Sequence, residues 1–204
     1  MNAPAQATFK PPRSLILIGA STGGTRVLTH LISLLPPLQA SIVIVQHMPK
    51  FINDSFIRTL RQYAAAKVCL AADGESLREG SVFLAPSEQH CTLVDNRSLR
   101  LAPGAKVNYV CPSVDVLMQS ARPPQNGQRL IGVLLTGMGK DGAAGLAHIK
   151  RLGGLTIAQN ESTCAVYGMP AQAAQLGCVD YELAPEDIAE MLAARAGVGK
   201  STHD

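Results

Sequence analysis

The sequence predicts an α/β protein with a doubly wound, mostly parallel sheet, helices on both faces and a small antiparallel hairpin insertion at one edge. Two observations predict this class. Short apolar runs of strand length alternate with segments of helical periodicity, which is typical of βαβ units. A Gly-rich corner at residues 19–24 also follows the first apolar run, where such a strand turns into a helix.

The first half of the chain starts with a strand over residues 15–19, whose continuous aliphatic run indicates burial on both faces. A helix over 25–35 follows, because its apolar residues recur on one face and Pro36-Pro37 ends it. A second strand covers 41–46. The next helix is expected over 53–66, with Asn53 or Asp54 as its cap.

The middle of the chain, residues 67–101, has a different pattern. Its short apolar runs at 82–85, 91–94 and 98–101 are separated by turn residues. These runs predict hairpins inserted at one edge of the sheet.

The βαβ rhythm returns after residue 112. We expect a helix over 113–121, a buried strand over 130–136, a helix ending near 152, a strand over 155–159 and C-terminal helices. No Pro/Gly/Ser-rich linker divides the chain, so residues 14–195 are expected to form one domain. Residues 1–13 are expected to be a disordered lead-in or linker stub, and residues 196–204 a disordered tail.

Composition excludes several classes of function. With 47% hydrophobic and 16% charged residues, the chain reads as globular, and no apolar run approaches the length of a membrane helix. A net charge of +3 without clusters gives no support for nucleic-acid binding. The five cysteines are odd in number and lack C-x-x-C spacing, which argues against disulfides or a zinc site and for a cytoplasmic location.

The Gly-rich corner has three interpretations: a tight turn, a phosphate loop, or a loop that presents Ser21 as a nucleophile. A dinucleotide fingerprint requires G-x-G-x-x-G, and here Ser21 stands where the second glycine belongs. The run Gly19-Ala20-Ser21-Thr22-Gly23 instead satisfies G-x-S-x-G, the pattern of a nucleophile elbow. That pattern is common, so it decides nothing alone.

A nucleophilic serine needs a base and a group that orients the base. His47 follows the second strand, and Asp141 follows the strand over 130–136. Because carboxyl ends of parallel strands meet at one edge of a sheet, we expect Ser21, His47 and Asp141 to meet there. Asp141 also fits a simpler role as the cap of the next helix. The chain order Ser–His–Asp disfavours the α/β-hydrolases, whose order is Ser–Asp–His.

Taken together, a series of motifs resembles the catalytic domain of the CheB chemotaxis methylesterases. The matching stretches are 18–25, 46–49, 72–75, 85–86 with His90, 112–117, 135–143, 158–161 and 167–170. They occur in family order across about residues 14–195. The ordered series is far more specific than any of its members.

The resemblance implies a serine hydrolase that removes methyl esters from glutamyl side chains of chemoreceptors and also deamidates certain receptor glutamines. It assigns Ser21 as nucleophile, His47 as base and Asp141 as the acid that orients His47. Turn geometry together with the resemblance suggests Thr22, Met138 and Gly139 as oxyanion or positioning residues. No metal or cofactor is expected. The expected partner is the cytoplasmic helical region of methylated receptors, and a receiver domain or other regulator acting in trans is a second candidate.

Two departures from the family pattern matter. Members usually have an N-terminal receiver domain, which we do not find, so the lead-in is either a linker stub or the start of a stand-alone enzyme. Many members also have arginines where this chain has Tyr109 and Cys111. Their loss casts doubt on the receptor substrate more than on the ester chemistry. The competing hypotheses are a non-catalytic module of the same fold, a methylesterase with a different receptor-like target, and a nucleotide-binding domain.

Overall fold

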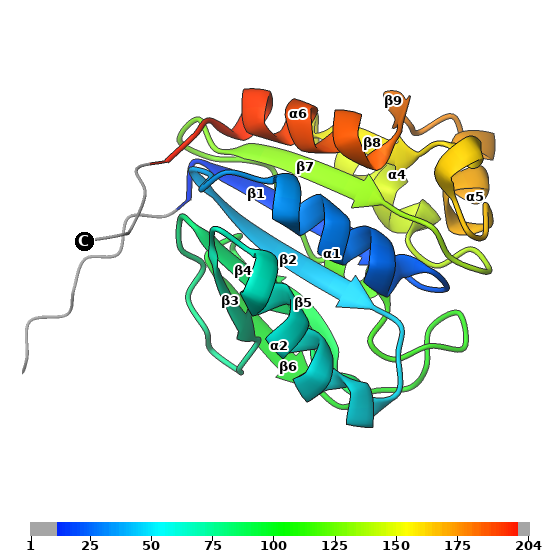
Figure 1. Ribbon diagram of the computed structural model, residues 1–204, viewed down its shortest axis with the longest axis horizontal. Helices are drawn as coiled ribbons and strands as arrows, with labels where there is room; N and C mark the ends of the chain where they lie inside the picture. The colour runs from blue at the N-terminus through cyan, green and yellow to red at the C-terminus, as the bar shows by residue number, and fades with distance from the viewer. Residues whose placement is uncertain (1–11, 200–204) are drawn as a thin grey trace, which may run out of the picture.

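The computed structural model describes residues 12–199, which fold around a seven-stranded parallel sheet (Figure 1). In spatial order its strands are β3 (Lys67–Leu70), β4 (Ser81–Leu84), β2 (Ala40–Gln46), β1 (Ser14–Ala20), β7 (Arg129–Leu134), β8 (Leu155–Gln159) and β9 (Tyr181–Leu183). From β1 in the middle of the sheet, β7, β8 and β9 follow in order toward one edge; toward the other edge lie β2, then β4, and then the edge strand β3. This arrangement confirms the predicted doubly wound α/β class.

Both faces of the sheet are covered by helices, and this explains the continuous apolar run in β1. Ile16 and Ile18 point into one core, and Leu15 and Leu17 point into the other. Successive side chains of a strand alternate between faces, so a strand buried on both sides needs apolar residues at every position.

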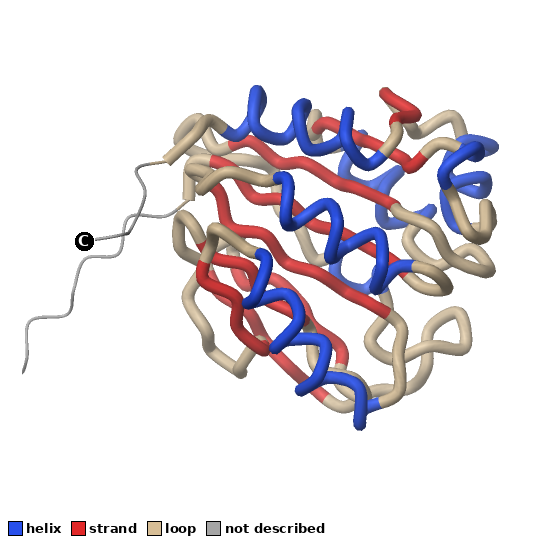
Figure 2. Tube along the Cα trace, in the orientation of Figure 1, coloured by secondary structure: helices blue, strands red, loops and turns tan. Residues whose placement is uncertain are grey.

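The helices are divided between the two faces (Figures 1 and 2). One face is covered by α1 (Gly24–Leu34), α2 (Asn53–Tyr63) and α6 (Pro185–Ala196), and the other by α3 (Val114–Gln119), α4 (Ala143–Arg151) and α5 (Met169–Gln175). Two short 3-10 turns, η1 (Lys50–Ile52) and η2 (Glu161–Thr163), lie in loops that follow β2 and β8.

The prediction for the middle of the chain is partly wrong. Residues 90–102 do form an antiparallel pair, β5 (His90–Val94) with β6 (Ser98–Ala102). The run at 82–85, expected in a hairpin, is instead β4, which pairs in parallel with β2 and with β3. A four-residue apolar run between turns has the same local pattern in a hairpin and in a parallel sheet, and only its distant partners decide between them.

The expected lead-in and tail fall largely outside the description, since residues 1–11 and 200–204 are not described. Within the expected tail, Ala196 is the last residue of α6, and Val198 forms an isolated bridge with Leu38. The carboxyl ends of β1, β2 and β7 lie at the other end of the sheet. They form the switch point at which doubly wound folds place their sites.

Candidate active site

The structure brings the three predicted residues to the carboxyl edge of adjacent strands. Ala20 at the end of β1 is paired with Gln46 at the end of β2, so Ser21 and His47 follow neighbouring positions. The His47 backbone N–H donates to Ala20 O at 3.0 Å, which holds the two turns together. Asp141 arrives from the loop after β7, and its Oδ2 lies 2.9 Å from His47 Nε2. This pair is shielded from water: Asp141 is 3% exposed, and the His47 side chain 11%.

The imidazole of His47 is held by its Nε2 atom. With Asp141 ionised, Nε2–H is the donor of this hydrogen bond, and Nδ1 keeps its lone pair. In the chymotrypsin-type triad the acid instead holds Nδ1, so the two nitrogens exchange roles here. Among residues 12–199, neither Nδ1 of His47 nor Oγ of Ser21 forms a hydrogen bond. Each is therefore available to the other, or to a substrate.

Gln46 joins the backbone of Ser21 to that of His47, a contact that the sequence did not predict. Its Nε2 donates to Ser21 O at 2.9 Å and to His47 O at 2.8 Å. The side chain is buried with 2% exposure, so both bonds lie away from competing water. Its position directly before His47, in one of the matched motifs, was the signal that could have identified it.

Asp141 lies at the centre of a dense set of hydrogen-bond donors. Its carboxylate accepts from His47 Nε2, from Ser113 Oγ at 2.6 Å, from the backbone N–H groups of Val114 at 2.7 Å and Asp115 at 3.2 Å, and from Asn108 Nδ2 at 3.1 Å. Burial raises the pKa of this carboxyl, but the bonds from His47, Ser113, Asn108 and Val114 outweigh burial and lower the pKa below its ordinary value. Asp141 is therefore a carboxylate held in its ionised form.

The lowered pKa of Asp141 predicts a specific loss of stability in acid. Unfolding returns this carboxyl to its ordinary pKa near 3.8, so its contribution to stability is complete above that pH and is lost as pH falls through the lower folded value. Urea unfolding between pH 7 and pH 2.5 measures the effect. We expect the wild type to lose more unfolding free energy over this range than Asp141→Asn does. If both proteins lost the same unfolding free energy over this pH range, the lowered pKa of Asp141 would be contradicted.

A second buried acid, Asp115, lies beside the first but serves the fold. Its Oδ1 accepts from the backbone N–H groups of Gly142 at 3.0 Å and Gly145 at 2.7 Å, so it caps the start of α4. Burial is the main reason that its pKa is raised, and the nearby charge of Asp141 adds to the effect. Asp115 makes no bond to His47 within the described residues, so Asp141 is the carboxylate that contacts the His47 ring.

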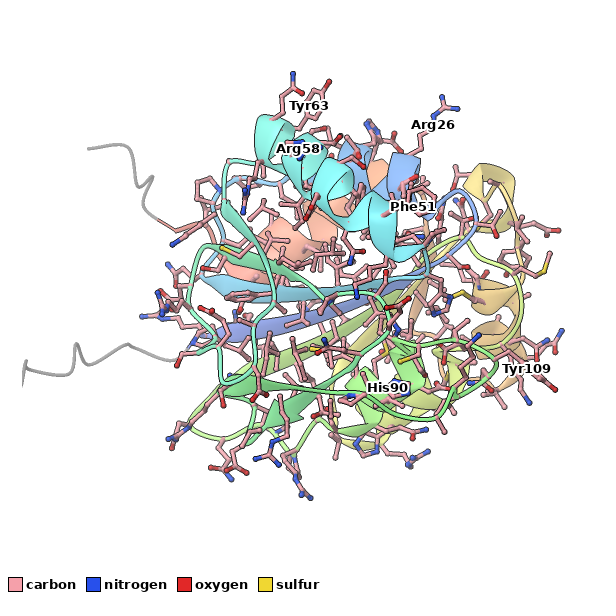
Figure 3. The ribbon with its side chains drawn as sticks, turned by 90° about the horizontal axis from the view of Figure 1, so that it is seen from below. Arg26, Phe51, Arg58, Tyr63, His90 and Tyr109 are labelled. Atoms are coloured by element: carbon pink, nitrogen blue, oxygen red, sulfur yellow. The ribbon has the colours of Figure 1, made fainter. Side chains whose placement is uncertain are left out.

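Asn108 bridges the two acids. Its single Nδ2 group donates to Asp115 Oδ2 at 2.8 Å and to Asp141 Oδ1 at 3.1 Å. Asn108 and Tyr109 both have positive φ angles, of 51° and 67°, which turn the loop sharply at this point. Tyr109, at a position where the family pattern often has arginine, projects into solvent at the edge of the molecule (Figure 3).

His90 supports the site from behind and is not a second base. It lies on the side of the sheet away from α1 and α2 (Figure 3), where its Nδ1 accepts from the Ser113 N–H at 3.2 Å. Its Nε2 donates to Ala105 O at 2.9 Å, so both ring nitrogens are engaged. Ser113, the N-cap of α3, thus connects the ring of His90 to the carboxylate of Asp141.

Removal of the Ser113 hydroxyl tests this support. In Ser113→Ala, Asp141 loses its shortest bond and α3 loses its cap, so we expect about 1–2 kcal/mol of lost stability. Because the change acts through Asp141, kcat is expected to fall on the order of tenfold with KM unchanged. Ser113→Thr, which keeps a hydroxyl, should recover most of both. A Ser113→Ala protein with wild-type kcat would contradict this positioning role.

The turn over residues 137–142 passes close to Ser21. The Ser21 N–H donates to Thr136 O at 3.0 Å, and a Cβ added at Gly137 would lie only 2.7 Å from Ser21 Cβ. The three predicted oxyanion residues, Thr22, Met138 and Gly139, lie in the two turns that meet here. Within the described part of the chain their backbone N–H groups have no acceptor. They are therefore free to donate hydrogen bonds to an oxyanion.

The described residues contain neither a metal-binding cluster nor a membrane-spanning helix. Between residues 12 and 199, no group of three or more His, Cys, Asp or Glu side chains is placed to hold a metal ion. In the same residues no helix is long and apolar enough to span a bilayer. The remaining described histidines make surface contacts: His30 pairs with Glu186, and His148 bonds to Ala121 O.

Comparisons with known proteins show the family of this chain. The family model described as CheB methylesterase matches residues 16–192. The structure superimposes on the crystal structure of the Thermotoga maritima CheB methylesterase catalytic domain with a TM-score of 0.83 and 37% identity, covering 89% of this chain and 97% of that one.

Curated relatives extend the comparison. Over 190 residues the chain is 40% identical to a protein-glutamate methylesterase/protein-glutamine glutaminase of Pectobacterium atrosepticum, covering 92% of this chain and 54% of the relative. Over 208 residues it is 43% identical to a second such protein from Bordetella avium, covering 96% and 59%. The chain therefore spans little more than half the length of these relatives.

Proposed function

Because this chain belongs to the CheB methylesterase family, we propose that it hydrolyses methyl esters of glutamyl side chains on chemotaxis receptors. The bond from His47 Nε2 to the buried carboxylate of Asp141 is the observation on which the proposal depends most. It fixes the proton on Nε2 and leaves the Nδ1 lone pair as the base for the neighbouring Ser21.

In the first step Ser21 Oγ attacks the ester carbonyl carbon, and its proton passes to His47 Nδ1. Asp141 stabilises the imidazolium that forms, without taking its proton. The negative oxygen of the tetrahedral intermediate is held by backbone N–H groups of Thr22, Met138 and Gly139. When the intermediate collapses, the bond to the methoxy oxygen breaks, and His47 returns the proton to give methanol and an acyl group on Ser21.

In the second step water replaces methanol. His47 Nδ1 takes a proton from the water as its oxygen attacks the acyl carbon, and His47 then gives that proton to Ser21 Oγ as the bond between Oγ and the acyl carbon breaks. The products are a glutamate carboxylate and free Ser21. The same two steps convert a glutamine to glutamate with ammonia as the leaving group, so we extend the proposal to deamidation, as in the names of the relatives.

The main competing hypothesis is a non-catalytic module that only binds a partner. Such a module has no need for a buried, ionised carboxylate that orients a histidine, since burying a charge costs free energy unless it is fully bonded. Methanol release from a methylated receptor fragment separates the two hypotheses. A folded wild-type chain that releases no methanol from that fragment would favour the non-catalytic module.

A further inference from the structure

The face formed by α1 and α2 displays aromatic and basic side chains that the chemistry does not use. Figure 3 shows Arg26, Phe51, Arg58 and Tyr63 on this face, where Arg26 and Tyr63 project away from the sheet. Phe51 is 80% exposed and Tyr63 is 51% exposed, large values for aromatic residues. Aromatic residues and arginine are the types most enriched at the energetic centres of protein interfaces.

A shallow groove of about 310 Å³ runs between the two helices. Its walls include Thr25 and Thr29 of α1 and Ser55 and Thr59 of α2. Thr29 donates to Thr25 O at 2.8 Å, Ser55 to Ile52 O at 2.9 Å and Thr59 to Ser55 O at 3.1 Å, each within its own segment. These three hydroxyl groups therefore already donate within their own segments. We expect a partner to be recognised by the arginines and aromatic rings on this face.

The charge of this face is unbalanced. Helix α1 contains no acidic residue, and Asp54 is the only one in α2. Other cations nearby are engaged: Lys50 with Glu88, His30 with Glu186, and Arg61 Nε with Val68 O. Arg26 and Arg58 form no ion pair or hydrogen bond through their side chains within the described residues, so both are available to an external anion.

The groove begins at the carboxyl edge of the sheet, where Ser21 and His47 lie; we call this edge the reaction edge. Thr25 and Arg26 lie four and five residues after Ser21, and Ile52 lies five residues after His47. Both helices run from that edge along the same face (Figure 1). The eleven residues of α2 extend for about 16 Å, enough for roughly three turns of a helix laid beside them.

We propose that the α1–α2 face docks an acidic helical segment of the substrate protein and so presents a glutamyl ester to Ser21. This inference depends on the proposed function for its substrate. A helix fits because side-chain ridges pack into a groove between two helices, and an acidic one fits the unpaired Arg26 and Arg58. Phe51 and Tyr63 supply the apolar anchors.

Binding measured without turnover tests the surface. The probe is a fluorescent helical peptide with several glutamates and one γ-methyl glutamate, titrated into the Ser21→Ala chain. Arg26→Glu with Arg58→Glu should weaken binding at least about tenfold, since attraction becomes repulsion at two sites. The control is Arg100→Glu, which reverses an exposed arginine of β6 on the opposite face and should change binding less than about twofold.

Four further results test the docking surface. Replacing the peptide glutamates by glutamine should remove the effect of the two reversals, and Phe51→Ala should weaken binding of both peptides. Equal binding by the double reversal and the Arg100→Glu control would overturn the proposal. Loss of binding to anionic lipid vesicles, with peptide binding unchanged, would overturn it in favour of a membrane surface.

The readouts separate this proposal from the proposed function. With Ser21 restored, the double reversal should raise KM for the ester peptide at least about tenfold. If the wild-type chain binds the peptide through Arg26 and Arg58 but releases no methanol, the proposed function fails and the docking surface stands. If the wild type and the double reversal both release methanol with the same KM, the docking surface is refuted and the proposed function stands.

Discussion

Ser21→Ala is expected to abolish methanol release, lowering kcat by about 10⁴–10⁶-fold while leaving the fold intact. The Ser21 backbone, which donates to Thr136 O and accepts from Gln46, is unchanged by the substitution. The hydroxyl forms no hydrogen bond within the described residues, so its loss leaves no donor or acceptor unsatisfied there. Only the attacking oxygen is removed.

The measurement is methanol release from a methylated receptor fragment, with circular dichroism and thermal unfolding as tests of the fold. Ser33→Ala is a matched control, because Ser33 is an exposed serine of α1 whose hydroxyl bonds only to His30 O. We expect wild-type turnover from it. Turnover near that of the wild type in Ser21→Ala would refute the acyl-enzyme mechanism.

Asp141→Asn is expected to lower kcat by about 10⁴-fold. An asparagine must place its NH₂ group on one of the two oxygen positions, and both positions receive donors. Oδ1 accepts from Ser113, Asn108 and Asp115, and Oδ2 accepts from His47 and Val114. With the amide on the His47 side, Nε2 becomes an acceptor and the proton moves to Nδ1, the nitrogen that must accept from Ser21.

The other orientation of the amide keeps the bond to His47 but sets its NH₂ against the donors of Asn108, Ser113 and Asp115. Either way the site loses its negative charge, so we also expect lower stability at neutral pH. Steady-state kinetics below the unfolding temperature measure the catalytic loss separately. Asp187→Asn, at an exposed acid in the first turn of α6, should match the wild type in both assays. An Asp141→Asn enzyme within tenfold of wild-type kcat would show that Asp141 does not orient the base.

The local pattern of the sequence was sufficient for most of the fold. The alternation of strand-length apolar runs with helical segments predicted the central strands β1, β2, β7 and β8 and their covering helices, because burial on both faces imposes continuous apolar runs. It did not predict β3 or the pairing of β4. Each of these strands has four residues, and β4 is inserted between β3 and the distant β2, so no local period distinguishes them from a hairpin.

The sequence by itself determined which three residues meet at the reaction edge, because parallel strands bring their carboxyl ends together whatever the side chains are. Only the tertiary structure decided that Asp141 contacts His47 while Asp115 caps the start of α4, that Nε2 is the nitrogen held, and that Gln46 joins Ser21 to His47. The tertiary structure also placed Arg26 and Arg58 on one face of the molecule. These features depend on contacts between side chains from separate elements, within a few tenths of an ångström, and periodicity contains no information about such distances.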